Sequence, residues 1–90
     1  IFAGNDLSAI GAINVLLQNK ISVPKQVKVI GFDNSPVATR SVPALSSIHQ
    51  PTRELGAEVA LSLLAILDGE EVADKLLDVE LIVRESTTAK

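Results

Sequence analysis

Hydrophobic side chains recur along this chain at regular intervals, and the interval in each stretch predicts the local structure. In residues 7–19 they fall three or four positions apart, which is typical of an amphipathic helix that covers a buried surface. The same interval returns in residues 52–67, and Gly69 is well placed to end that second helix. We therefore predict two helices, the first of them capped by Asp6.

Other stretches have the patterns of β-strands. Residues 27–32 are mostly apolar and bounded by turn residues, which predicts a strand covered on both faces. Residues 77–83 alternate between apolar and other side chains, with Leu77, Val79, Leu81 and Val83 on the face expected to be half-buried. Residues 1–4 and 47–49 are expected to be short strands, the first of them buried, and residues 86–90 a polar tail. The order strand, helix, strand at the start predicts a βαβ unit with parallel strands.

Composition excludes several classes of function. The chain is 47% hydrophobic and 21% charged, so it is not a disordered sequence. Without cysteine it has neither a disulfide framework nor a thiolate metal site, which fits a cytoplasmic protein. A net charge of −3 and only two aromatic residues argue against direct DNA binding by these residues. No apolar stretch approaches the ~20 residues of a membrane span. Because the chain begins at Ile1 with no leader segment, we expect it to be an excerpt.

Catalysis and cofactor binding find no support in the sequence. It has no Gly-x-Ser-x-Gly elbow, no phosphate-binding glycine loop and no His-Glu-x-x-His motif. Its single histidine, His49, has no partners at metal-ligand spacing and is expected to be structural. Arg84 and Glu85, at the end of the last strand, are expected to make surface ion pairs. We therefore predict a binding protein without a cofactor or a metal.

Three polar residues follow predicted strands and form the candidate ligand site. Asn5, Asp33 and Gln50 each come directly after a strand, and ligands of open α/β sheets bind beyond the carboxyl ends of the strands. A carboxylate accepts hydroxyl hydrogen bonds while amides donate and accept, so the trio suits a polyol, a sugar or a nucleobase. Each residue also has a simpler reading. Asn5 can cap the helix, Asp33 can head an Asx-turn, and Gln50 can be an ordinary loop residue.

Several motifs, in order, resemble the LacI/GalR family of bacterial transcriptional regulators. They are residues 2–12 (FAGNDLSAIGA), 23–34 (VPKQVKVIGFDN), 43–51 (PALSSIHQP), 54–56 (ELG) and 81–86 (LIVRES). The resemblance spans nearly the whole chain. It implies part of a type I periplasmic-binding-protein-like fold, an α/β architecture with a βαβ parallel sheet and flanking helices, in which two lobes enclose a small-molecule cleft. It also implies that Asn5, Asp33 and Gln50 line that cleft.

The resemblance implies a domain organisation and a function as well. Residues 1–49 and 76–88 are expected to belong to the C-terminal lobe, and the helix at 52–67 to pack on the N-terminal lobe. The parent protein is expected to be a cytoplasmic homodimer that senses a sugar or related metabolite and binds operator DNA through a separate headpiece. The alternative is a solute-binding protein of a transport system, which shares the fold. Nothing in the sequence identifies the effector.

Overall fold

The chain forms two compact units. The structure is a computed structural model that describes residues 1–88. The first unit consists of Ile1–His49 and the segment from Glu80 onward, and the second unit is Gln50–Val79. The second unit is therefore an insertion between two parts of the first. The expected assignment of these parts to two lobes of a larger protein stays a prediction.

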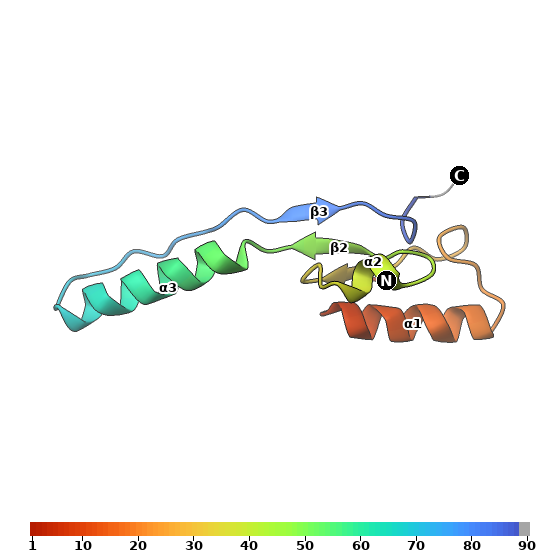
Figure 1. Cartoon of the computed structure of the whole chain (residues 1–90), viewed down its shortest axis with the longest axis horizontal. Helices are drawn as coiled ribbons and strands as arrows, with labels where there is room; N and C mark the ends of the chain where they lie inside the picture. The colour runs from red at the N-terminus through yellow and green to blue at the C-terminus, as the bar shows by residue number, and fades with distance from the viewer. Residues whose placement is uncertain (89–90) are drawn as a thin grey trace. The chain divides into compact units, whose positions relative to one another are not determined.

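The first unit is a small mixed sheet with helices (Figure 1). Its elements are α1 (Asp6–Gln18), β1 (Ile30–Phe32), α2 (Val37–Arg40), β2 (Ser46–His49) and β3 (Glu80–Ile82). The sheet order is β1-β2-β3, with β1 and β2 parallel and β2 and β3 antiparallel. The expected parallel pairing is thus confirmed for β1 and β2, and β3 adds an antiparallel edge.

The expected buried strand at residues 1–4 is wrong in extent and in burial. Phe2 forms a single parallel bridge with Ile30, and the side chains of Ile1 and Phe2 are exposed. Two backbone hydrogen bonds hold this segment beside β1, from the Ala3 amide to the Ile30 carbonyl (2.8 Å) and from the Ile30 amide to the Ile1 carbonyl (2.9 Å). The parallel direction of the βαβ unit is therefore present, although its first strand is reduced to one bridge.

The core of the first unit lies between α1 and the sheet. Ala9 and Ile13, one helical turn apart, are fully buried because α1 turns this stripe toward the sheet. The other buried hydrophobic residues come from the loops and α2, namely Val23, Val29, Ala38 and Leu45. The strand predicted at 27–32 begins only at Ile30, since the Val29 amide bonds to the Ser86 carbonyl (3.1 Å) outside the sheet ladder.

The segment after β3 differs from the expectation of a polar tail. Ser86 is fully buried; its hydroxyl donates to the Val29 carbonyl (2.6 Å) and accepts from the Ser46 amide (2.8 Å). The predicted strand at 77–83 is also shorter, and Ile82 is the half-buried residue of β3. Of the face expected to be half-buried, Leu77 is half-buried, whereas Val79, Leu81 and Val83 are exposed. Because residues 81–83 are all apolar, the sequence pattern does not determine which face of β3 turns inward. The pairing of β3 with β2 determines it.

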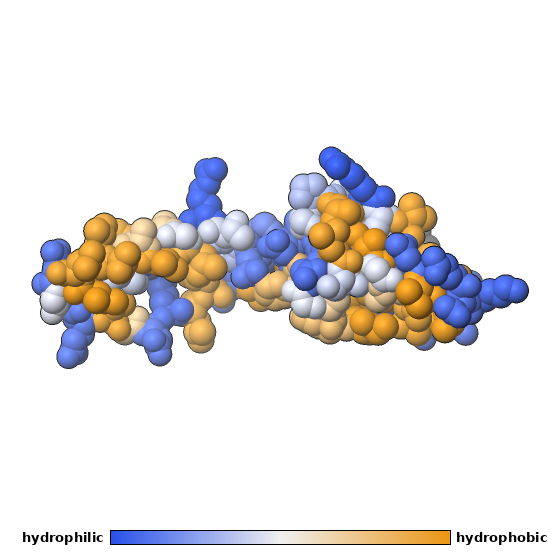
Figure 2. Space-filling model, turned by 90° about the horizontal axis from the view of Figure 1, so that it is seen from below, coloured by the Kyte–Doolittle hydropathy of each residue, from blue (hydrophilic) through white to orange (hydrophobic). Residues whose placement is uncertain are grey.

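The second unit is built on α3 (Thr52–Leu67), which has the bounds that the sequence predicts. Its helix ends as expected: Gly69 has φ +82°, and its amide bonds to the Ile66 carbonyl (3.0 Å). No residue of α3 is buried, and hydrophobic side chains gather along this helix in Figure 2. The apolar stripe of α3 is thus exposed; its members are Leu55, Val59, Leu63 and Ile66.

Candidate functional site

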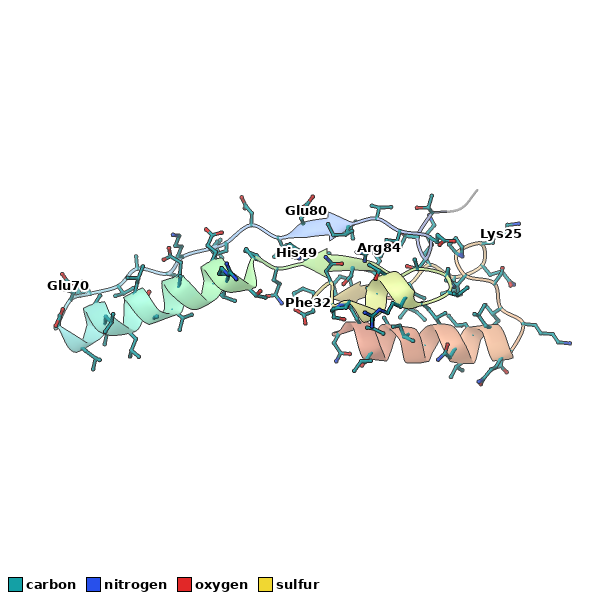
Figure 3. The ribbon with its side chains drawn as sticks, viewed as in Figure 1. Lys25, Phe32, His49, Glu70, Glu80 and Arg84 are labelled. Atoms are coloured by element: carbon teal, nitrogen blue, oxygen red, sulfur yellow. The ribbon has the colours of Figure 1, made fainter. Side chains whose placement is uncertain are left out.

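The candidate site lies at the edge where the two parallel strands of the first unit end. Phe32 closes β1 and His49 closes β2, and Figure 3 shows both residues at the same end of the sheet. Asp33 follows β1 immediately, and its side chain is exposed. The carboxyl edge of a parallel strand pair is where ligands of open α/β sheets bind, so Asp33 stands in the expected position.

Asn5 is the N-cap of α1. It has extended backbone geometry, and its side-chain oxygen accepts a hydrogen bond from the Ser8 amide (2.8 Å). The expected cap, Asp6, is wrong; Asp6 is the first residue of the helix. The Asn5 side chain is exposed, and among residues 1–88 its NH2 group has no hydrogen-bond partner. Capping therefore uses the oxygen of Asn5 and leaves its donors for another group.

Asp6 instead turns inward and ties α1 to the end of β1. Its side chain is only 2% exposed and accepts three hydrogen bonds. One oxygen accepts from the Ser35 amide (2.6 Å) and the Ser35 hydroxyl (2.8 Å), and the other accepts from the Ser47 hydroxyl (2.6 Å). These bonds bring the Asn5 end of α1 and the turn that carries Asp33 to the same edge. Sequence reasoning missed this role because helix capping explains an aspartate at that position equally well.

The turn after β1 has an unusual backbone. Asp33 has φ +110° and Asn34 has φ +53°, a region that residues with a side chain seldom adopt. Such conformations cost on the order of 1–3 kcal/mol each and persist where the surroundings hold them. Here the Asp33 amide donates to the Ile48 carbonyl (2.8 Å), and the Asn34 amide donates to the Ser47 hydroxyl (2.9 Å). The predicted turn is present, and β2 anchors it.

Arg84 supports the same turn, which corrects the expectation that it makes a surface ion pair. Its guanidinium donates to the Leu45 carbonyl (2.8 Å) and to the side-chain oxygen of Asn34 (2.7 Å). Arg84, labelled in Figure 3, follows the last residue of β3, Ile82, by two positions, so β3 carries it to the Asn34 turn. The planar guanidinium suits this role because it presents several donors in a fixed geometry. An ion pair between Arg84 and any acid is absent from residues 1–88.

The remaining sequence-predicted residues contribute less to this edge. His49 is exposed, and its Nδ1 lies 3.4 Å from the side-chain nitrogen of Asn34. Gln50 follows β2 directly and is half-buried; it belongs to the second unit, where its carbonyl accepts from the Thr52 amide (2.8 Å). The structure thus brings Asn5 and Asp33 to one edge, and a shared site with Gln50 stays a prediction.

This arrangement is suited to binding hydroxyl groups. Asp33 offers an exposed carboxylate that accepts hydrogen bonds, and the NH2 group of Asn5 donates them. A group of three or more acidic or histidine ligands that suits a metal ion does not occur within the described part of the chain. Nor does any helix of residues 1–88 combine the length and apolar character needed to cross a membrane.

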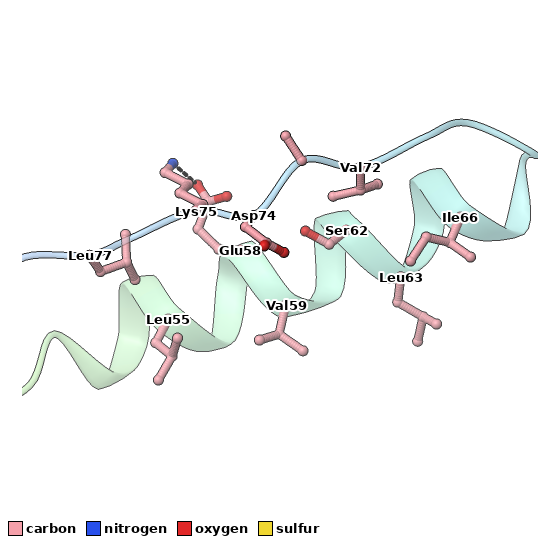
Figure 4. Close-up of a pocket in the computed structure, with 11 residues that line it drawn as sticks. Leu55, Glu58, Val59, Ser62, Leu63, Ile66, Val72, Asp74, Lys75 and Leu77 are labelled. Atoms are coloured by element: carbon pink, nitrogen blue, oxygen red, sulfur yellow. Dashed lines mark hydrogen bonds and ion pairs between the residues drawn. The ribbon is translucent and has the colours of Figure 1, made fainter.

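A separate groove lies within the second unit, between α3 and residues 72–77 (Figure 4). Its volume is about 470 Å³, and its lining is mostly apolar. Lys75 bridges the two walls by an ion pair with Glu58 (2.8 Å). The hydrogen bond that Lys75 donates to Glu58 raises the pKa of the Lys75 amine, and the nearby negative charges of Glu58 and Glu54 act in the same direction. Sequence reasoning did not foresee this groove, because the segment after α3 has no periodic pattern that indicates which residues face the helix.

Comparison with known proteins decides the family. Residues 1–87 match the model of the periplasmic binding protein-like domain. The chain belongs to this family. The chain is also 43% identical over 89 residues to the HTH-type transcriptional regulator GntR of Pseudomonas aeruginosa. That match covers 97% of the chain but 26% of the regulator, so the chain spans about a quarter of that relative's length.

Solved structures of periplasmic binding protein-like domains have the same fold. A periplasmic binding protein/LacI transcriptional regulator from Alkaliphilus metalliredigens, complexed with D-xylulofuranose, superimposes with a TM-score of 0.81 at 36% identity; the match covers 99% of this chain and 34% of that one. The Lac repressor dimer bound to operator superimposes with a TM-score of 0.87 at 30% identity, covering 98% and 31%. The resemblance to LacI/GalR regulators that the motifs indicate is therefore confirmed, together with the fold class.

Proposed function

We propose that this chain is part of the effector-binding region of a LacI-type transcriptional regulator that senses a sugar or a related metabolite. The observation that carries the proposal is the exposed carboxylate of Asp33, held on an anchored turn at the strand edge beside the Asn5 end of α1. The solved relative in complex with D-xylulofuranose supports a sugar as the ligand class.

The proposed ligand contacts follow from hydrogen-bond chemistry. Asp33 accepts from two neighbouring hydroxyl groups, and the NH2 group of Asn5 donates to a hydroxyl oxygen while its own oxygen caps α1. Gln50, the third proposed contact, supplies an amide that donates and accepts. A sugar matches this set because each of its hydroxyl groups both donates and accepts.

A regulator is better supported than the alternatives. The GntR relative is named a transcriptional regulator, and the Lac repressor relative is described as a dimer bound to operator. We therefore propose that the intact protein is a cytoplasmic, non-enzymatic dimer whose operator binding depends on residues outside these ninety. In that protein the apolar stripe of α3 is proposed to pack on the N-terminal lobe. A solute-binding protein of a transport system is the weaker candidate.

Effector binding is tested with the full-length protein that contains this chain. A thermal-shift screen of pentoses, hexoses and disaccharides identifies the sugar, and calorimetry then measures its affinity. Replacing Asp33 with alanine removes charge-assisted hydrogen bonds worth about 1.5–3 kcal/mol, so affinity is expected to fall about 10- to 150-fold. The matched control is Asp68→Ala, which removes the exposed aspartate at the end of α3 and is expected to leave affinity unchanged. Equal affinity of the Asp33→Ala variant and the parent contradicts the proposed site.

Regulation is tested by a mobility-shift assay with the operator of the parent protein. The sugar found in the screen is expected to change operator affinity of the full-length protein, since it favours one arrangement of the lobes. The ninety residues alone, with a net charge of −3, are expected to give no specific shift at physiological salt. Specific binding by the ninety residues, or full-length operator binding that is insensitive to sugar, contradicts the proposal.

A further inference from the structure

The most completely hydrogen-bonded side chain near the proposed site belongs to a residue outside it. The buried carboxylate of Asp6 accepts from the amide and the hydroxyl of Ser35 and from the hydroxyl of Ser47. Ser35 lies two residues after Asp33, and Ser47 lies in the neighbouring strand β2. Two of the donors therefore belong to the 33–35 turn itself, and the third comes from β2 beside it.

Ser47 extends the reach of Asp6 to the turn itself. Its hydroxyl donates to Asp6 (2.6 Å) and at the same time accepts from the amide of Asn34 (2.9 Å). Because that hydroxyl has only one hydrogen, donating it to the carboxylate leaves its lone pairs available to the Asn34 amide. Asp6 thus fixes Ser35 directly and orients the hydroxyl that holds Asn34.

The turn needs such support because of its backbone. Asp33 and Asn34 both have positive φ, and neither is glycine. An unsupported turn of this sequence relaxes toward negative φ, which redirects the Asp33 side chain. Asp6 accepts hydrogen bonds from Ser35, the residue directly after the strained pair, so these bonds oppose that relaxation.

Room for the Asp6 carboxylate depends on a glycine in β1. A Cβ on Gly31 meets the Asp6 carboxylate oxygen and lies 2.8 Å from a methyl group of Leu45. The absence of a side chain at Gly31 therefore lets Asp6 approach the sheet from α1. Gly31 and Asp33 thus belong to one three-residue segment. Gly31 leaves room for Asp6, and Asp6 supports the turn that carries Asp33.

We propose that Asp6 is a positioning residue of the effector site, which acts by holding the 33–35 turn so that Asp33 presents its carboxylate at the sheet edge. The inference rests on the proposed function for its ligand, while its conformational part concerns the turn alone. Asp6 itself is buried and does not touch the ligand in this scheme.

The conformational part is tested by hydrogen–deuterium exchange of the full-length protein without ligand. In Asp6→Asn, one acceptor oxygen becomes an amide donor facing groups that are donors themselves. The peptide that carries the Asp33, Asn34 and Ser35 amides is expected to exchange about tenfold faster, since the Ser35 amide loses its acceptor and the Ser47 hydroxyl that holds the Asn34 amide is no longer oriented by a carboxylate. The peptide that covers the last two turns of α1, away from Asp6, is the internal reference and is expected to keep its parental rate.

A second variant keeps the test decisive if Asp6→Asn loosens the whole unit. Ser35→Ala removes only one of the three bonds to Asp6, and a smaller acceleration confined to the same peptide is expected. Ser41→Ala is the control, because within residues 1–88 that hydroxyl bonds only to the carbonyls of Ala38 and Pro43. Unchanged exchange of the 33–35 amides in both Asp6→Asn and Ser35→Ala overturns the inference, as does acceleration spread equally over α1 in Ser35→Ala.

Titration with D-xylulose separates this inference from the proposed function. If the parent binds D-xylulose, Asp6→Asn is expected to weaken binding about tenfold although Asp6 makes no contact with the sugar. Faster local exchange with unchanged affinity shows that the turn moves without affecting binding, which overturns the positioning role and leaves the sugar site intact. If Asp33→Ala also leaves affinity unchanged, the proposed site fails, and the exchange result alone decides what Asp6 does to the turn.

Discussion

Ser86 offers the sharpest test of how the first unit is held together. Its hydroxyl is fully buried and bonds to two backbone groups that are far away in sequence, the carbonyl of Val29 (2.6 Å) and the amide of Ser46 (2.8 Å). It thereby joins the segment after β3 to the segment before β1 and to the start of β2. Ser86→Ala deletes the hydroxyl and leaves both backbone groups without this partner.

The expected loss follows from the cost of stranding buried polar groups. Each buried donor or acceptor that loses its partner costs about 1–3 kcal/mol. Two such groups give a loss of about 2–6 kcal/mol. The total free energy of unfolding of typical domains is about 0.05–0.15 kcal/mol per residue, or about 5–14 kcal/mol for 90 residues. With a urea m-value of about 1 kcal/mol per M, even a loss of about 2 kcal/mol lowers the unfolding midpoint by about 2 M.

Urea unfolding followed by far-ultraviolet circular dichroism measures this loss, which suits a chain without tryptophan or tyrosine. Ser8→Ala is the matched control, since Ser8 is exposed and its hydroxyl makes no hydrogen bond within residues 1–88. The control is expected to change stability by less than about 0.5 kcal/mol. A Ser86→Ala midpoint as close to the parent as that of Ser8→Ala refutes the reasoning.

Three further predictions concern packing, capping and charge. Gly31→Ala places a methyl group against Asp6 and is expected to lower the free energy of unfolding by about 1–3 kcal/mol in the same urea assay; an unchanged midpoint contradicts the close approach. Asn5→Ala is expected to cost about 1 kcal/mol through loss of the helix cap while Asn5→Asp retains it, so equal stability of the two variants argues against capping. Because Glu58 raises the pKa of Lys75, the ion pair stabilises the fold below the ordinary lysine pKa and is lost as pH rises through the folded-state pKa. Nuclear magnetic resonance titration of Lys75 is expected to give a lower pKa in Glu58→Gln than in the parent. An equal pKa in the two proteins contradicts the assignment of the raised pKa to Glu58.

Local sequence determined the two long helices, α1 and α3, and the motifs, but not the short helix α2. α3 has the predicted bounds, and α1 differs from its prediction by one residue at each end, because helical periodicity and end signals act over a few residues. The strand-end argument also placed Asn5 and Asp33 at a common edge, since parallel strands end on the same side. These features need no knowledge of distant partners, and the ordered motifs sufficed to indicate the family.

Only the tertiary structure decided which polar residues are buried and which face of β3 turns inward. Asp6, Arg84 and Ser86 each have an ordinary surface role in sequence terms, yet their partners lie 29, 50 and 57 residues away. Hydropathy predicts that apolar residues are buried. It does not predict the burial of a polar side chain whose hydrogen-bond partners are distant in sequence. Ile82, rather than Leu81 or Val83, is half-buried because β2 sets the register of an all-apolar stretch. These residues have their roles because the assembled sheet brings their distant partners into contact.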